Sequence, residues 1–412
     1  MPELILAGIL LLILSLAGTP LFAIVAAIGL LAFHAAGIDT AALIIELNRL
    51  ADFPALIAIP LFTFAGQVLA ESKAPQRLMN LVQAIFGWLP GGMAVVAICT
   101  TAVFTAFTGA SGVTIIALGG LLYPSLLRQG YPENFSLGLM TTSGSLGLLF
   151  PPSLPIILYA LVAKVSLDTL FLAGLLPGIL LVVVLSAYSI RVGIHSKVER
   201  IPLLPLPILV IGGIYGGVFT AAEAAAVTAF YALIVEVFIR RDLKLFGDIG
   251  RIVRESMMLV GAILIMLGAA LGLTNYLIDQ EIPNALFNLI SQYVDNKIVF
   301  LLILNAILLG INMFEVFSAI IIIVPIIIPI AMKYDVNPIH LGIMFLMNLE
   351  IGYMIPPLAL NLFLASSTFK KPLPKIYRAV FPFLLLLLAV LLLITYVPDV
   401  SLVLTRLMGS PL

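Results

Sequence analysis

Long, nearly uncharged apolar stretches constrain the fold of this chain more than any other feature of its sequence. Leu170–Ile190 and Ala379–Val397 are examples, and each has roughly the 20 residues that a helix needs to cross a bilayer. Hydrophobic residues make up 62% of the 412 residues and charged residues 10%, against about 25% in soluble domains. The runs do not alternate with polar residues, as the strands of a membrane barrel would. We therefore expect an all-α polytopic membrane protein in a lipid bilayer.

The polar residues exclude several function classes. The 20 basic and 20 acidic residues balance to a net charge of zero, which gives no indication of nucleic acid as a partner. The single cysteine, Cys99, excludes an intrachain disulfide and is expected to pack as a core residue. His34, His195 and His340 lack metal-ligand spacing and are expected to be packed or interfacial. With no phosphate loop and no nucleophile elbow, the sequence predicts neither an enzyme nor a cofactor.

Two proline pairs interrupt apolar runs at matching places in the chain. Pro151-Pro152 and Pro356-Pro357 stand 205 positions apart. Proline lacks an N–H and clashes with the preceding turn, so each pair should split a span into two half-helices. In lipid such breaks persist only where protein or a wet cavity surrounds them. Interrupted spans in corresponding positions of two halves indicate the binding site of a transporter.

A pair of short apolar helices precedes each break. The pairs are Ala94–Thr108 with Val113–Leu127, joined by Gly109-Ala110-Ser111-Gly112, and Ile298–Ile311 with Val316–Met332, joined by Asn312-Met313-Phe314-Glu315. Each pair is short for two full crossings, so we interpret both as re-entrant hairpins with tips near mid-membrane. The order of hairpin, broken helix and long helix then occurs twice.

The distribution of charge predicts orientation. Basic residues cluster at Arg191–Arg200, Arg240–Arg254 and Lys370–Arg378, while Asp279–Asp295 is acidic. Because cytoplasmic loops are enriched in Lys and Arg, the base of the first hairpin should lie inside and that of the second outside. The halves then form an inverted repeat with both termini outside, if Leu4–Phe33 crosses twice with a split at Gly18-Thr19-Pro20.

Two amphipathic segments, Pro75–Phe86 and Pro283–Tyr293, each come just before a hairpin. Amphipathic helices of this kind lie along the membrane surface. They could brace a moving part against a fixed one, or serve only as surface-packed connectors.

The half-helix ends offer ligand chemistry without fixed charges. A helix N-terminus suits a carboxylate, and free carbonyls at a C-terminus suit sodium. Small polar residues near the breaks and tips can complete either shell: Thr108, Ser111, Thr114, Ser143, Ser145, Ser153, Asn312, Glu315, Ser318, Asn348 and Asn361. The candidates for substrate contact are Thr114, Ser143, Ser153, Ser318 and Asn361. The alternative role of each is to satisfy freed backbone groups.

Four charged residues in apolar surroundings have alternative roles. Glu315 at the second tip either balances an ion or caps the following helix, and an intramembrane ionisable group is a functional candidate by default. Glu350, just before the second break, has either a structural partner or a ligand role. Thr220-Ala-Ala-Glu223 has the spacing of a capping box. Lys164 is interpreted as the end of a half-helix.

Several ordered motifs together resemble one transporter family. They are Thr108-Gly-Ala-Ser-Gly-Val-Thr114, Tyr123-Pro124, Gly130-Tyr131-Pro132, Gly144–Ser153, Leu170–Gly178, Gly217–Glu223, Pro338–Gly342, Asn348–Gly352 and Pro356-Pro357. Over nearly its whole length the chain resembles the large membrane subunit of TRAP transporters, the DctM-like M subunit.

The resemblance implies an elevator-type protein, in which a transport domain slides against a scaffold under a sodium gradient. The parts would be 1–92 and 166–296 for the scaffold and arms, 93–165 and 297–369 for the transport domain, and 370–412 for a C-terminal helix. It also implies a small four-helix membrane subunit, a periplasmic substrate-binding protein, and a multi-pass location in a bacterial or archaeal cytoplasmic (inner) membrane. Substrates in the family are small carboxylates such as C4-dicarboxylates, keto acids and sialic acids.

The same resemblance assigns two sodium sites. The first set is Ser111, Gly144 and Gly147; the second is Asn312, Met313, Glu315, Gly352 and Met354. The chain departs from the family at both tips, since a second serine or an alanine is expected after Ser111 and an aspartate is common in place of Glu315. No small subunit is fused to the chain, so a separate polypeptide is expected.

Three other functions remain for comparison. A stand-alone divalent-anion/sodium symporter has a similar architecture but usually carries Ser-Asn-Thr at its hairpin tips. A channel needs a continuous pore lining, against which paired dead-end hairpins argue. An intramembrane enzyme needs catalytic residues, and the sequence offers none.

Overall fold

The structure, a computed structural model, describes residues 19–41, 54–86, 92–195, 221–311, 316–356 and 359–408, with short pieces between residues 7 and 48. Across these ranges every regular element is a helix, as the sequence predicts. Four of the described helices are long and apolar enough to cross a membrane, or five if a pair bent by 42° at Phe150–Ser153 counts as one span. The helical membrane fold is therefore confirmed.

The predicted repeat of helix pair, broken helix and long helix occurs in both halves. The first half contains α2 (Leu21–Ala35), η2 (Pro54–Ile57), α4 (Ala58–Glu71), α5 (Ala74–Phe86), α6 (Gly92–Thr108), α7 (Ser111–Arg128), α8 (Glu133–Ser143), η3 (Leu146–Leu149), α9 (Leu154–Ala163) and α10 (Leu167–His195). The second contains α12 (Ala221–Leu233), the π-helical η4 (Ile234–Ile239) and η5 (Leu245–Ile249), α13 (Gly250–Asp279), α14 (Ile282–Ser291), α15 (Lys297–Ile311), α16 (Val316–Lys333), α17 (Pro338–Gly352), α18 (Leu360–Phe369), α19 (Leu373–Tyr396) and α20 (Asp399–Leu407). Helices α7 and α16 begin and end 205 positions apart, the spacing of the two proline pairs.

Local chemistry explains where the half-helices begin and end. Lys164 and Lys370, at the ends of α9 and α18, both have left-handed backbone with φ of 55° and 53°, a common way to stop a helix. This confirms the interpretation of Lys164. At the start of α17, Asn337 Oδ1 accepts hydrogen bonds from the amides of Ile339 and His340, as an N-cap does.

Two helix boundaries in the first half lie close to predicted breaks. Helix α8 ends at Ser143, eight residues before the expected break at Pro151, because residues 146–149 tighten into a 3₁₀ turn. Helix α2 begins directly after Pro20, in agreement with a split there. Residues 15–18 and most of the preceding stretch lie outside the described residues, as do the second tip at 312–315 and Pro357.

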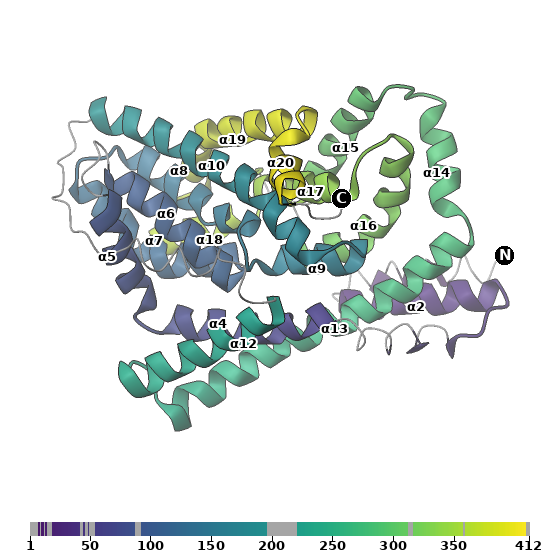
Figure 1. Cartoon of the computed structure of the whole chain (residues 1–412), viewed down its shortest axis with the longest axis horizontal. Helices are drawn as coiled ribbons and strands as arrows, with labels where there is room; N and C mark the ends of the chain where they lie inside the picture. Colours follow the sequence, from purple (N-terminus) through teal and green to yellow (C-terminus); the bar gives the residue numbers. More distant parts are fainter. Residues whose placement is uncertain are drawn as a thin grey trace.

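The helices form two layers. In Figure 1, α2, α4, α12 and α13 lie along the lower edge, and the remaining helices from α6 to α10 and from α15 to α20 form a thicker upper body. We call these the lower layer and the upper body. The lower layer has a small hydrophobic core of its own that includes Val68, Ala232, Val237 and Ile252. Helices α5 and α14 lie at opposite ends of the molecule and run across the direction of α13.

The two halves interlock in the upper body. Helix α6 contacts η3 and α15 contacts α17, so the first helix of each pair packs on the broken helix of its own half. The second helix crosses over: α7 contacts α18, and α16 contacts α9. Each broken helix is therefore built against parts of both halves.

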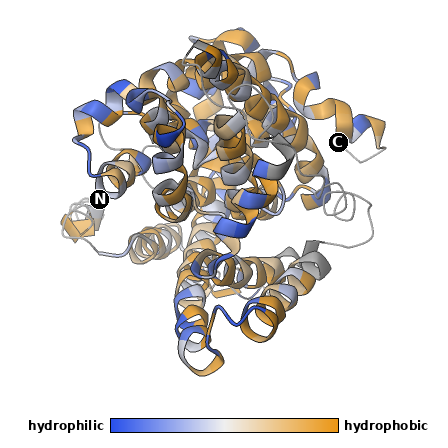
Figure 2. Cartoon of the chain, turned by 90° about the vertical axis from the view of Figure 1, so that its left-hand side faces the viewer, coloured by the Kyte–Doolittle hydropathy of each residue, from blue (hydrophilic) through white to orange (hydrophobic). Residues whose placement is uncertain are grey.

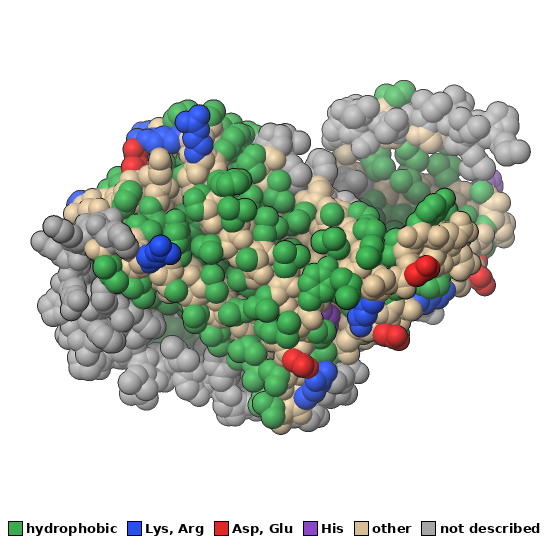
Figure 3. All heavy atoms as spheres, turned by 90° about the horizontal axis from the view of Figure 1, so that it is seen from above, with side chains coloured by type: hydrophobic (Ala, Val, Ile, Leu, Met, Phe, Trp, Pro, Cys, Tyr) green, Lys and Arg blue, Asp and Glu red, His purple; other side chains and the backbone are tan. Residues whose placement is uncertain are grey.

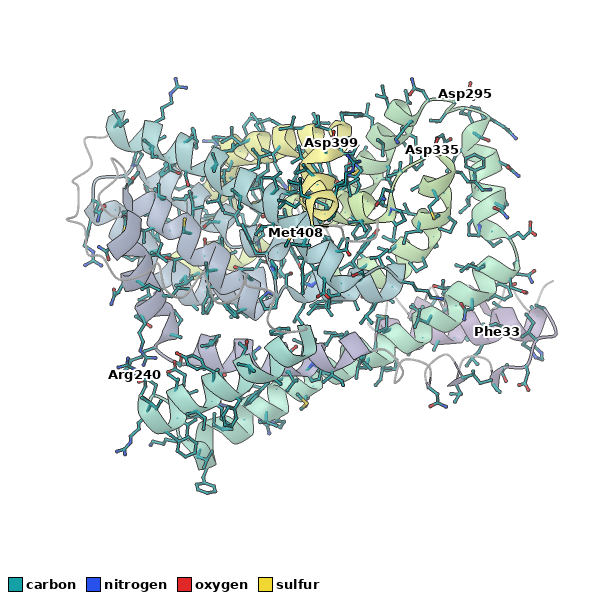
Figure 4. All side chains as sticks on the ribbon, in the orientation of Figure 1. Phe33, Arg240, Asp295, Asp335, Asp399 and Met408 are labelled. Carbon is teal, nitrogen blue, oxygen red and sulfur yellow. The ribbon has the colours of Figure 1, made fainter. Side chains whose placement is uncertain are left out.

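The outer surface suits a lipid environment. Ile116, Val183 and Phe381 are each more than half exposed, hydrophobic residues make up most of the described ribbon in Figure 2, and hydrophobic side chains are spread over the described part of the face in Figure 3. Charged residues lie at both ends of the long axis and also beside α20, where Asp399 is labelled in Figure 4. Figure 4 shows Arg240 at one end of the long axis and Asp295 and Asp335 toward the other.

Candidate functional site

The turn between α6 and α7 is a tight hairpin tip that rests on the start of α9. Gly109 has φ of +64°, a conformation that glycine adopts without steric cost. A Cβ on Gly109 would lie 2.9 Å from the side chain of Leu154, the first residue of α9. Glycine is therefore needed here both for the turn and for the close approach.

The same tip also contacts α18 of the other half. The Ser111 hydroxyl donates to Asn361 Oδ1 at 2.9 Å. Both side chains are buried, with Ser111 3% and Asn361 0% exposed. One residue further, a Cβ on Gly112 would lie 2.5 Å from Leu364 Cδ1. The tip thus bridges the first turns of α9 and α18, the two half-helices that follow the proline breaks.

Two threonines hold the broken helix α8–α9 against the hairpin. Thr105 Oγ1 donates to the Gly144 carbonyl at 2.8 Å and lies 2.7 Å from Thr114 Oγ1. Because Thr105 has one hydroxyl proton, Thr114 is the donor in that pair. Thr114 was expected to contact the substrate, and Thr105 was not among the residues predicted for the site. The sequence contains a signal for Thr105. Thr105 lies three residues before the end of α6 and Thr114 three residues after the start of α7, so the two face each other once the helices pair.

The predicted first sodium set is brought only partly together. A Cβ on Gly144 would lie 3.3 Å from the Ser111 carbonyl, so these two residues are neighbours. Gly147 packs instead on α6, where a Cβ would overlap backbone atoms of Ala102 and Ala106. The Gly144 and Gly147 carbonyls already accept hydrogen bonds from Thr105 and from the Phe150 amide, and each keeps a second lone pair for a cation.

Five buried donors near the breaks and the first tip have no acceptor among the described residues. They are the hydroxyls of Thr108, Thr142, Ser143 and Ser153 and the Nδ2 group of Asn361. Ser153 is the N-cap of α9, and Asn361 lies in the first turn of α18. An unsatisfied buried polar group costs about 1–3 kcal/mol. An anion would satisfy such donors, and helix N-termini favour anions.

The second half differs in its polar contacts. Gly352 ends α17 and Met354 is fully buried in the following turn, but Asn312, Met313 and Glu315 lie outside the described residues. Ser318 is buried in α16. Asn348 Nδ2 donates to Asn305 Oδ1 at 2.7 Å, and Asn305 donates to Thr395 at 2.9 Å. Asn348 therefore ties α17 to α15 and α19.

The remaining candidates divide into structural and unexplained groups. His340 is packed, with Nδ1 2.8 Å from Ser401 Oγ, as expected. Glu350 is fully buried, and neither carboxylate oxygen has a hydrogen-bond partner among the described residues, so a structural partner, one of its two expected roles, is not found there. Thr220 of the proposed capping box lies outside the described residues. Within the described chain, no three His, Cys, Asp or Glu residues group to hold a metal.

Comparison with known proteins gives consistent matches. The family model described as "Tripartite ATP-independent periplasmic transporter, DctM component" matches residues 5–400. The C4-dicarboxylate TRAP transporter large permease protein DctM of Pseudomonas aeruginosa is 34% identical over 387 residues, which cover 89% of this chain and 90% of that protein. The isethionate TRAP transporter permease protein DctMQ of Oleidesulfovibrio alaskensis is 35% identical over 374 residues, covering 86% of this chain and 59% of that protein.

The chain is also similar to a further TRAP permease and to one solved structure. An ectoine/5-hydroxyectoine TRAP transporter large permease of Ruegeria pomeroyi is 30% identical over 372 residues, covering 86% of this chain and 87% of that protein. Among solved structures, the YdaH transporter of Alcanivorax borkumensis superposes with a TM-score of 0.63 over 86% of both chains at 14% identity. At this identity, the YdaH match supports the fold alone.

Proposed function

The chain belongs to the DctM family of TRAP transporter large permeases, and on that premise we propose that it is the sodium-coupled permease subunit that imports small organic anions by an elevator movement. The surroundings of the first hairpin tip are the observation that most directly supports this proposal. Buried hydroxyl and amide donors without acceptors among the described residues lie near a turn where Ser111 and Gly144 are neighbours and can both offer oxygen ligands to a cation.

The substrate class follows from the donors. Thr114, Ser143, Ser153, Ser318 and Asn361 are the proposed substrate contacts. Of these, Ser153 and Asn361 combine an unused donor with a half-helix N-terminus, which together suit a carboxylate. The relatives are named for C4-dicarboxylates, isethionate and ectoine, and each of these compounds carries a carboxylate or a sulfonate.

The sodium ions would bind on the other side of each tip. We place one ion at Ser111 with the carbonyls of Gly144 and Gly147, and the other at Asn312, Met313 and Glu315 with Gly352 and Met354. In the first site, the Thr105–Gly144 hydrogen bond fixes the orientation of the Gly144 carbonyl, and Gly144 is a neighbour of Ser111. Hard oxygen ligands of this kind suit sodium as the transported coupling ion.

The layered architecture supports the elevator movement. Residues 93–165 and 297–369 form the proposed moving part, and because α10 contacts α6, α17 and α20, we include α10 in it. The lower layer with its own core forms the fixed part. The two meet closely at Gly66 of α4, where a Cβ would lie 2.7 Å from the Phe107 carbonyl beside the hairpin tip. Glycine at this contact leaves a smooth surface for sliding.

The partners in this proposal are a small four-helix membrane subunit and a periplasmic binding protein, with the assembly in the bacterial inner membrane. The family description calls the transporter tripartite and periplasmic. The DctMQ relative, of which this chain covers 59%, fits a large permease joined to a further part.

The test is uptake by reconstituted protein. Proteoliposomes that hold the chain with its small subunit, supplied with the binding protein and an inward sodium gradient, should accumulate carboxylates such as succinate. Removing the sodium gradient or the binding protein should abolish uptake. Strong uptake by the chain alone would favour the stand-alone divalent-anion/sodium symporter instead.

A further inference from the structure

A single hydrogen bond joins a proposed sodium ligand to a proposed substrate contact. Ser111 donates its hydroxyl proton to Asn361 Oδ1 at 2.9 Å, across 250 positions of sequence. Both side chains are at least 97% buried, so water does not compete with the bond. The contact lies where α7 of one half packs on α18 of the other.

We infer that the Ser111–Asn361 hydrogen bond is the link through which sodium binding and carboxylate binding strengthen each other. The inference rests on the proposed function and adds a coupling route to it. It treats Ser111 and Asn361 as positioning residues for each other's ligand, in addition to their own contacts.

The bond fixes the orientation of the Asn361 amide. The two ends of an asparagine amide have the same shape, and hydrogen bonding decides which end points where. With Oδ1 held by Ser111, Nδ2 must point away from the tip, and it is a buried donor with no acceptor among the described residues. If Ser111 did not donate, the amide could rotate and present its oxygen, which repels a carboxylate.

The bond also fixes the orientation of the Ser111 hydroxyl. Its proton points toward Asn361, so its lone pairs are free for a cation. A cation at those lone pairs withdraws electron density and makes the hydroxyl a stronger donor, since chained hydrogen bonds polarise one another. Sodium therefore favours the amide orientation that binds a carboxylate, and a bound carboxylate favours the hydroxyl orientation that binds sodium.

The crossing between halves gives the link a conformational role. Ser111 belongs to the hairpin tip and Asn361 to α18, so the bond exists only when the tip is seated on α18. Ligands that strengthen the bond hold the tip in place. Loss of either ligand weakens this bond between the two halves of the moving part.

The experiment measures how each substitution changes the binding midpoint of the ligand that the substituted residue does not itself contact. Full-length chain purified with its small subunit is titrated with sodium and with succinate, and thermal stabilisation gives the midpoint of each titration. For the wild type, saturating succinate should lower the sodium midpoint by about 5- to 150-fold, the usual range for coupled sites.

Asn361→Ala should raise the sodium midpoint by about fivefold or more even without succinate, because Ser111 loses its orienting acceptor. Ser111→Ala should raise the succinate midpoint even at saturating sodium. The double variant should show no further loss of coupling, because contacting residues are non-additive in such a cycle. Ser111→Thr keeps the hydroxyl and should restore most of the coupling.

Ser366→Ala is the matched control, since it removes a hydrogen bond to the Lys371 carbonyl at the far end of α18 and should leave both midpoints unchanged. The inference is overturned if Asn361→Ala changes only the succinate midpoint and Ser111→Ala changes only the sodium midpoint. That result would leave the proposed function intact. A wild type that neither ligand stabilises would contradict the proposed function itself.

Discussion

Around the first tip, single side chains make contacts that cannot be inferred from their residue type alone. Thr105 is one of many hydroxyl residues in the apolar helix α6, yet it holds both Thr114 and the Gly144 carbonyl. Thr100 and Thr101 are equally buried on the same helix and do not make this contact. What distinguishes Thr105 is its distance from the turn, which places it opposite Thr114 once the helices pair.

Thr105→Val tests this role because valine has nearly the same shape and no hydroxyl. The substitution leaves the Gly144 carbonyl without its donor, at a cost of about 1–3 kcal/mol. We expect a lower thermal unfolding midpoint and a right-shifted sodium dependence of uptake. Thr101→Val is the comparison, since Thr101 donates only to carbonyls of its own helix. Equal effects of the two substitutions would contradict the role of Thr105.

Two glycines provide a second test at this scale. A Cβ on Gly147 would overlap the backbone of Ala102 and Ala106, whereas a Cβ on Gly120 would meet nothing within 4 Å. Gly147→Ala should therefore separate η3 from α6 and abolish transport. Gly120→Ala should be neutral or stabilise α7 by up to about 1 kcal/mol, the helix-propensity difference. Expression level, unfolding midpoint and succinate uptake of the two variants decide the matter.

Ser111→Ala addresses the ion site itself. It removes one oxygen ligand while keeping the turn made by Gly109. Half-saturation by sodium in uptake assays should move to concentrations roughly 5- to 150-fold higher, at about 1.4 kcal/mol per factor of ten. An unshifted sodium curve with normal uptake would mean that Ser111 only closes the hairpin.

At the scale of elements, most boundaries could be predicted from sequence because proline, glycine and apolar runs act locally. The pairs α6–α7 and α15–α16, both surface helices α5 and α14, and the restart at Leu21 all lie within a few residues of their predicted positions. The early end of α8 could not be predicted, because single glycines and serines are tolerated inside helices, and Gly144, Ser145 and Gly147 do not by themselves end one. Only tertiary packing of Gly147 on α6 tightens them. For the same reason, the Ser111–Asn361 contact could not be predicted, since it depends on the crossing of α7 to α18.

The surface helix α5 is fixed to the lower layer by charge. Arg77 Nη1 lies 2.8 Å from both Glu236 oxygens, and Nη2 pairs with Asp242. The two carboxylates are only 4% and 8% exposed. Burial alone would raise the pKa of Asp242, but the Lys73 amide and the Arg77 guanidinium lower it, so the carboxylate stays charged at neutral pH.

Arg77→Met should therefore destabilise the protein. It leaves the nearly buried Glu236 carboxylate without its ion-pair partner and leaves Asp242 with Lys73 alone, and breaking a fully buried pair costs about 3–5 kcal/mol. Because Arg77 is itself 34% exposed, solvent screening reduces this to about 1–3 kcal/mol. Arg251→Met is the control, since its pair with Glu71 is more exposed. A fall in unfolding midpoint no larger for Arg77→Met than for Arg251→Met would contradict the anchoring role.

At the scale of the whole molecule, the contacts of α8 and of α16 lie at opposite ends of the long axis. Near one end, Glu133 at the start of α8 pairs with Lys371 and Lys375 at 2.6 Å. Near the other, Lys333 at the end of α16 donates to Asn284 of α14 at 2.7 Å. Figure 1 shows α5 and α14 at these opposite ends. The arrangement supports the proposal that the halves are inverted.

Cysteine labelling tests the inverted topology directly. In a Cys99→Ser background, single cysteines replace Arg128, Lys371, Asp279 or Lys333 in turn. A membrane-impermeant thiol reagent applied to intact cells should label the Asp279 and Lys333 positions only. The other two should label only after the membrane is opened. Labelling of the Arg128 and Lys333 positions from the same side would sink the inverted repeat.

The crossing of α7 onto α18 has a consequence for biosynthesis. Ser111 leaves the ribosome 250 residues before Asn361, an interval on the order of 10 to 50 s at typical translation rates. During that time, the first hairpin enters the membrane without the helix that it will rest on, and its polar tip has only its own half as shelter. The nascent chain must therefore tolerate an unfinished hairpin in lipid or be shielded by an insertion factor.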